Sequence, residues 1–132
     1  AHGTPKKPND LLSEEHACLL LRFPGSTQYN WELETRSGVR KLGVHGPFES
    51  DDGDVLTDWA LDGHGIVNKP WFEIAHHLAN GNLVEVLPDS PPSTTNLAII
   101  YPHKRLQDPK VRLFIDFMTE NIRNRISEVM EA

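Results

Sequence analysis

The sequence is poor in cysteine, in long hydrophobic runs and in clustered positive charge. Cys18 is the only cysteine among 132 residues, which excludes a disulfide within the chain and suits a reducing compartment. The apolar runs are far shorter than the roughly 20 residues of a membrane-spanning helix, and no secretion signal is recognisable. The formal net charge is −6, so these residues lack the basic stripe that binds a nucleic-acid backbone. We therefore expect a cytoplasmic chain that binds neither membrane nor, by itself, DNA.

Several segments have the pattern of β-strands. The apolar run "ACLLLRF" at residues 17–23 is typical of a strand that is covered on both faces. "WELET" and "VRKLGVHG" predict two more strands, separated by a turn at Ser37 and Gly38. Shorter apolar segments predict further strands, at residues 65–68, 83–87 and 97–101.

Helical segments alternate with these strands. Each has apolar residues at helical spacing and a recognisable boundary residue at one end or both. The predicted helices run from Asp51 or Asp52 to Gly63, from Pro70 to Gly81, and from Asp108-Pro109 through a stripe of Val111, Phe114, Ile115, Met118, Ile122, Ile126 and Val129. The alternation predicts an α/β fold with a mostly parallel sheet flanked by helices.

Two features could indicate chemistry, and both have a simpler structural interpretation. Gly63-His64-Gly65 resembles part of a dinucleotide-binding fingerprint, but Asn68 replaces the third glycine and the segment follows a helix instead of a strand. A helix end followed by close packing explains it better, and no cofactor is predicted. Cys18 lies inside an apolar strand and is interpreted as a small core residue rather than a nucleophile.

The carboxylates of residues 49–54 form an acidic cluster. A hydrolase or metalloenzyme could use them as acid, base or ligand, which is the alternative to a non-enzymatic role. The cluster lacks the ligand pattern of a calcium loop, and the sequence has neither H-x-x-x-H nor C-x-x-C spacing. Helix capping by aspartate explains the cluster more simply. We therefore predict no metal site and no enzyme activity.

The ends of the predicted strands are the best candidates for binding. In an open parallel sheet, ligands bind beyond the carboxyl ends of the strands. These ends lie at Arg22-Phe23, at residues 47–50 and at Asn68-Lys69. The segment at 48–52 also begins a helix, whose first N–H groups are free to bind a polar ligand. From these residues alone, a ligand site and a set of solvated loops remain equally open.

The order of several short motifs resembles the effector-binding region of LysR-type transcriptional regulators. The first group is Gly3, Pro5, Pro8, Asp10, Leu11, His16, Cys18 and Leu19, followed by Trp31. The segment from "VHGPFESDDGD" to "LVEVLPD" and the closing "IIYPHKR" and "PKVRLFIDFMTE" complete the pattern. The resemblance extends from Gly3 to about Arg125. Two positions depart from it: Asp51 or Asp52 replaces the usual Asn, and His64 separates the two glycines.

The resemblance implies a fold like that of the type 2 periplasmic binding proteins, in which two α/β lobes enclose a ligand cleft. Residues 1–96 would be the second lobe, and residues 97–132 would be a return strand and C-terminal helix that belong to the first lobe. The family's winged helix-turn-helix, which binds DNA, is expected to be missing from these residues, together with most of the first lobe.

The resemblance also implies a function and a site. The chain would be the sensor fragment of a bacterial regulator that binds a small-molecule effector, controls transcription and self-associates as a homodimer or tetramer. A pure dimerisation module is a further alternative. The positions expected to face the cleft are Arg22, Tyr29, Trp31, Phe48, Glu49, Ser50 and Asn68. Arg22 or Ser50 would provide polar recognition, and the three aromatic residues would provide apolar walls.

Overall fold

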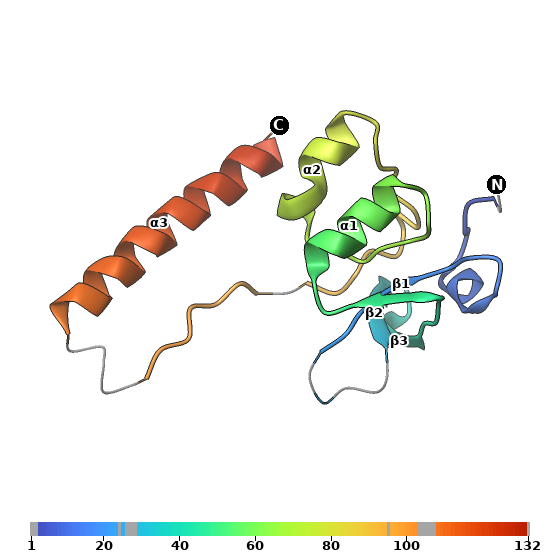
Figure 1. The fold of residues 1–132 in the computed structure, drawn as a ribbon, viewed down its shortest axis with the longest axis horizontal. Coiled ribbons are helices and arrows are strands. Elements are labelled where there is room, and N and C mark those ends of the chain that lie inside the picture. The colour runs from blue at the N-terminus through green and yellow to red at the C-terminus, as the bar shows by residue number, and fades with distance from the viewer. Residues whose placement is uncertain (1–2, 24, 26–28, 95, 103–107, 132) are drawn as a thin grey trace. The chain divides into compact units, whose positions relative to one another are not determined.

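The chain divides into two units, Ala1–Thr94 and Thr95–Ala132. Figure 1 shows a computed structural model that describes residues 3–23, 25, 29–94, 96–102 and 108–131. Part of the "IIYPHKR" motif lies at residues 103–105, outside the described residues. None of the helices in the described ranges is long and apolar enough to cross a membrane.

The first unit contains a small parallel arrangement around strand β1, Leu19–Leu21, which lies beside β4, Phe48–Ser50. On the other side of β1, Ile66 forms a single parallel bridge with Cys18. The Leu19 N–H donates to the Ile66 carbonyl at 2.8 Å, and the Ile66 N–H donates to the Ala17 carbonyl at 2.8 Å. The apolar run at 17–23 is therefore the middle of three neighbouring backbones, as its lack of alternation predicts.

The second pair of strands is a hairpin. Strands β2, Asn30–Thr35, and β3, Gly38–Gly43, pair antiparallel, with Trp31 opposite Leu42. Only two residues separate them, which is too few for the crossover that a parallel pair requires. The α/β class holds, but the parallel pairing is limited to β1, β4 and Ile66 in the part of the chain that the structure describes.

Alternation along β1 divides the core between its two faces. Cys18 and Leu20 face the hairpin and pack with its buried residues. That cluster consists of Leu11, Cys18, Leu20, Leu33, Leu42, Val44 and Leu87. Leu19 is also buried, at 1% exposure, but lies outside this cluster. Helix α1, Gly53–Leu61, contacts β1, and its Leu56 side chain is likewise only 1% exposed.

Both short helices end as the sequence predicts. At the end of α1, the Gly63 N–H donates to the Ala60 carbonyl and the His64 N–H donates to the Trp59 carbonyl. Gly63 has a φ of +79°, which favours glycine. Helix α2, Trp71–Ala79, follows Pro70 and ends in the same way at Gly81. The Gly63-His64-Gly65 segment therefore begins as a helix end, and this part of its interpretation is confirmed.

Gly65 lies against the backbone of the segment before β1. A Cβ atom added at Gly65 would be 2.5 Å from the Ala17 carbonyl oxygen. The absence of a side chain lets this segment approach closely enough to form the bridge at Ile66.

Three predicted strands are not formed. The segment at 65–68 makes only the bridge at Ile66, and residues 83–87 and 97–101 are not strands. A strand needs a neighbouring backbone to pair with. No described residues pair with the segments at 83–87 and 97–101. Leu87 has a φ of 57°, which also interrupts an extended conformation. The three predictions were wrong because apolar composition cannot supply a pairing partner.

The second unit contains an extended segment and the long helix α3, Pro109–Glu131. Asp108 begins the helix, and its carboxylate accepts the Lys110 N–H at 3.0 Å. The predicted stripe is half-buried, except that Phe114 is 60% exposed. Phe114 lies one residue, or about 100°, away from Ile115 around the helix and so falls outside the stripe. The stripe contributes to a hollow of about 320 Å³ within this unit, lined in part by Leu97, Ile99, Ile122 and Ile126.

Candidate functional site

The carboxyl ends of β1 and β4 meet at one place, because the two strands are parallel. The Arg22 N–H donates to the Ser50 carbonyl at 2.8 Å and extends the pairing by one residue. The ladder places Leu20 opposite Glu49. Arg22 follows Leu20 by two residues, so Arg22 and Glu49 project from the face of β1 and β4 that the hairpin covers.

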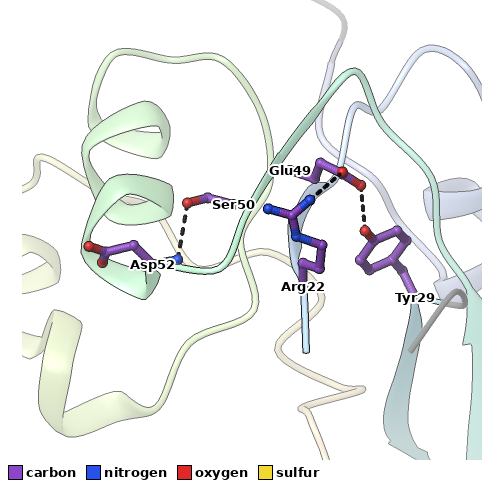
Figure 2. Close-up of polar contacts among 5 residues, drawn as sticks. All are labelled: Arg22, Tyr29, Glu49, Ser50 and Asp52. Atoms are coloured by element: carbon purple, nitrogen blue, oxygen red, sulfur yellow. Dashed lines mark hydrogen bonds and ion pairs between the residues drawn. The ribbon is translucent and has the colours of Figure 1, made fainter. Parts of the chain in front are cut away.

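Three predicted site residues meet on this face (Figure 2). The Arg22 guanidinium lies 3.5 Å from one carboxylate oxygen of Glu49. The Tyr29 hydroxyl donates a hydrogen bond to the other carboxylate oxygen. Tyr29 comes directly before the hairpin, so the cluster joins the start of β2 to the ends of β1 and β4. These contacts bring together residues that are up to 27 positions apart in the sequence.

The electrostatics of this cluster favour a neutral tyrosine. The hydrogen bond from Tyr29 to Glu49 raises the pKa of the phenol. Ionisation would remove the donated proton and place two negative groups side by side. Tyr29 is therefore a hydrogen-bond donor at neutral pH.

Phe48 and Ser50 lie on the other face. The Phe48 ring lies 5.3 Å from the Trp59 ring and 5.4 Å from the His64 ring, measured between centroids. The Ser50 hydroxyl accepts the Asp52 N–H at 3.0 Å (Figure 2). Both residues therefore belong to the junction between β4 and α1, which is separate from the Arg22, Tyr29 and Glu49 cluster.

Trp31 and Asn68 occupy two further environments. Trp31 is partly buried and packs against the hydrophobic core beside the hairpin. Asn68 is half-buried and lies two residues after the Ile66 bridge. The seven predicted site residues are thus distributed over both faces of the strands, and among them only Arg22, Tyr29 and Glu49 are joined by side-chain hydrogen bonds.

The acidic cluster at 49–54 has structural partners. Asp52 is the N-cap of α1, and its carboxylate accepts the Asp54 N–H at 2.8 Å. Glu49 contacts Arg22 and Tyr29. No group of three histidine, cysteine, aspartate or glutamate side chains that could hold a metal ion occurs among the described residues. Two carboxylates of the cluster, those of Asp52 and Glu49, therefore act in capping and pairing.

Lys69, which was predicted only to end a strand, has a structural role. Its side chain is only 6% exposed and forms an ion pair with Glu73. Its ammonium group also donates to the Gly53 carbonyl at 3.2 Å, in the first turn of α1. Lys69 thus fixes the start of α1 relative to the first turn of α2. The spacing of four residues to Glu73 was the available signal, but the contact with Gly53 depends on the tertiary structure.

A small hollow lies at the other end of the parallel strands. It has a volume of about 270 Å³ and contains His16 and His45. The remaining lining residues are Ser13, Glu14, Ala17, Gly46 and Pro47. None of the seven predicted site residues lines this hollow.

The chain is similar to known regulatory proteins. Residues 1–123 match the sequence model of a family described as the LysR substrate binding domain. Among curated relatives, the regulator DmlR of Escherichia coli is 30% identical over 119 residues, which are 90% of this chain and 38% of DmlR. The activator TtdR of Escherichia coli is 27% identical over 89% of this chain and 37% of TtdR. The chain thus spans less than two fifths of the length of these two relatives.

Solved structures of LysR-type regulators share the fold of this chain. CrgA, a LysR-type transcriptional regulator from Neisseria meningitidis, superposes with a TM-score of 0.68 at 26% identity, over 91% of this chain and 40% of CrgA. The Vibrio cholerae virulence activator AphB superposes with a TM-score of 0.69 at 30% identity, over 89% of this chain and 39% of AphB. The expected architecture, that of a periplasmic-binding-protein-like regulatory domain, is confirmed by these two neighbours.

Proposed function

Because the chain belongs to the LysR substrate binding domain family, we propose that it is the sensor region of a transcriptional regulator and binds a small-molecule effector. The observation that supports the proposal is the polar cluster of Arg22, Tyr29 and Glu49 at the carboxyl ends of β1 and β4. This is the edge at which open parallel sheets bind ligands. A guanidinium and a phenol can orient a polar effector without reacting with it.

We propose that residues 1–96 form the second lobe of the effector domain and that residues 97–132 belong to the first lobe. The division of the chain after Thr94 supports a boundary close to this position. A ligand between two lobes favours one interlobe geometry only by its difference in affinity for the two arrangements. In the whole regulator, that difference would change how a DNA-binding domain outside residues 1–132 meets the promoter.

No catalytic step is part of this proposal. The named relatives are transcriptional regulators, and the carboxylates of Asp52 and Glu49 are engaged in the capping and pairing described above. We also propose that the chain self-associates, because the second unit exposes several large apolar side chains, among them Ile100 at 94%. A dimerisation surface and an effector site can occur in the same domain.

Binding of small molecules to the purified chain tests the sensor role. A panel of small organic acids, amines and neutral metabolites is titrated into the isotope-labelled protein, and the backbone amide resonances are followed by NMR. We expect at least one compound to shift the signals of Arg22, Tyr29 and Ser50 in a saturable manner. Gly81, at the end of α2, provides an internal control that should not move. The absence of saturable shifts at the strand ends across the whole panel would contradict the sensor role.

A further inference from the structure

The side chain of Glu49 occupies the groups that would bind an effector. Its carboxylate accepts the hydrogen bond from the Tyr29 hydroxyl with one oxygen and faces the Arg22 guanidinium with the other (Figure 2). Two donors on different segments thus already converge on one carboxylate. The carboxylate of Glu49 therefore stands in the place that the carboxylate of a guest molecule would take.

We propose that Glu49 is a built-in competitor, and that this site takes a small carboxylate ligand which displaces Glu49 from Arg22 and Tyr29. The inference rests on the sensor function proposed above and specifies the chemical class of its effector. It also changes the role expected for Glu49, from a contact of the effector to an internal substitute for it.

The contact between Arg22 and Glu49 is weak enough to be exchanged. Its length of 3.5 Å exceeds the roughly 2.7–2.9 Å of a strong charge-assisted hydrogen bond. The two side chains are 51% and 47% exposed, so water and salt screen the attraction between them. A carboxylate that approaches from solvent therefore has to displace only an ion pair of low net strength at Arg22.

The donors also select for charge. Arg22 carries a guanidinium that only donates hydrogen bonds, and the Tyr29 hydroxyl acts as a donor to Glu49. Once Glu49 moves away, both donors lack an acceptor, and a planar group with two anionic oxygens satisfies them best. An amine would instead require Glu49 to leave Arg22 and would then face the guanidinium, which carries the same charge.

The experiment compares Glu49→Gln with the unmodified chain. Glutamine keeps the size of the side chain and can still accept from Tyr29, but it carries no charge to hold Arg22. The probes are benzoate and succinate, with benzamide and succinamide as neutral analogues, titrated while the amide signals of residues 22 and 29 are followed by NMR. We expect Glu49→Gln to bind the carboxylates about fivefold more tightly, which corresponds to the upper range for an exposed ion pair, and to leave the amides unaffected.

Two further variants control this comparison. Glu32→Gln removes the carboxylate of another exposed ion pair, whose oxygen lies 3.7 Å from Lys41 on the hairpin, and should bind the probes as the unmodified chain does. Arg22→Gln in the Glu49→Gln background should abolish the gain in affinity. An equal gain for the amides, or a gain that persists without Arg22, would overturn the proposal.

A second measurement tests the contact itself. The Tyr101→Phe background leaves Tyr29 as the only tyrosine, so its ionisation can be followed by ultraviolet absorbance. Glu49→Gln should lower the pKa of Tyr29, because the anionic acceptor is gone. An unchanged pKa would overturn the proposal.

The binding experiments separate the failure of this proposal from the failure of the sensor role. If the carboxylates do not bind, or bind equally to both proteins, while another panel compound still binds at the strand ends, the role of Glu49 as a competitor is rejected and the sensor role stands. If nothing binds, both are rejected.

Discussion

At the scale of single residues, Cys18 shows how burial decides chemistry. The side chain is completely inaccessible, and its sulfur lies 3.8 Å from the carbonyl oxygens of Leu11 and His16. Burial raises the pKa of the thiol to about 11, because the thiolate would lose its hydration. The interpretation of Cys18 as a core residue, made from its position in an apolar run, agrees with this environment.

Alkylation of Cys18 should therefore be slow in the folded protein. The rise in pKa from the ordinary 9.0 to about 11 reduces the thiolate fraction about 100-fold at pH 8, and steric protection reduces the rate further. We expect iodoacetamide to label the chain at least about 100 times faster in denaturing urea than in buffer, as measured by mass spectrometry. Rapid stoichiometric labelling of the native chain would contradict the buried position.

Side chains of neighbouring residues at the end of β4 point to opposite faces. Arg22 and Glu49 were expected at the same end of the sheet, and the structure places their charged groups 3.5 Å apart. Phe48 and Ser50 are their immediate neighbours but point to the opposite face, because side chains alternate along a strand. The sequence did not mark residues 48–50 as a strand, so this division could not be foreseen.

At the scale of elements, two glycines let neighbouring backbones approach β1. Gly46 lies so close that an added Cβ would be 1.9 Å from the Cys18 carbonyl oxygen. Gly65 makes the corresponding approach to Ala17 from the segment that contains Ile66. Both contacts involve backbone atoms of the segment just before β1, which cannot move without breaking the parallel pairing.

The substitution Gly46→Ala should destabilise the fold. We expect a loss of about 3 kcal/mol in the free energy of unfolding, at the upper end for an overpacked site, measured by urea denaturation. Gly43→Ala is the matched control, since the nearest atom to its added Cβ would be the Asn30 side-chain oxygen at 3.8 Å. Similar unfolding midpoints for the two variants would show that the close approach at Gly46 is absent.

The start of α1 provides a second prediction at this scale. Replacing Asp52 by alanine removes the acceptor for the Asp54 N–H and should reduce the stability by about 1 kcal/mol. Asp51→Ala, at the exposed neighbouring position, should change it by less than about 0.5 kcal/mol. Thermal unfolding followed by circular dichroism measures both variants. Equal losses would indicate a general charge effect in place of a specific cap.

At the scale of the whole molecule, the exposed apolar side chains of helix α3 determine whether the chain is expected to self-associate. Helix α3 exposes Leu113, Phe114 and Phe117 by 60–71%, on a side of the helix that the half-buried stripe does not include. Three large side chains within five residues form the kind of exposed patch that marks an interaction site.

Self-association of the isolated chain is therefore expected. Sedimentation experiments should give an average mass that rises above the monomer mass as the concentration increases. The double substitution Phe114→Ser with Phe117→Ser should shift the equilibrium toward monomer, whereas Asn124→Ser, at another exposed position on α3, should leave it unchanged. A chain that remains monomeric at high concentration would rule out this surface as an association site.

Local interactions explain what the sequence by itself determined. The N-cap at Asp52, the glycine ends of α1 and α2, and the middle position of the run at 17–23 depend on residues close together in the chain or on a continuous apolar pattern. The family was also recognisable, because the order of its short motifs is a property of the sequence alone.

Only the tertiary structure decided which side chains meet. The failure of residues 83–87 and 97–101 to form strands, and the contacts of Lys69 with Gly53 and of Glu49 with Arg22, all depend on partners distant in the sequence. The physical reason is that a backbone or charged group is satisfied by whichever partner the fold places beside it. Composition and spacing indicate which backbone segments and charged side chains require a partner, but they do not indicate which residues will be that partner.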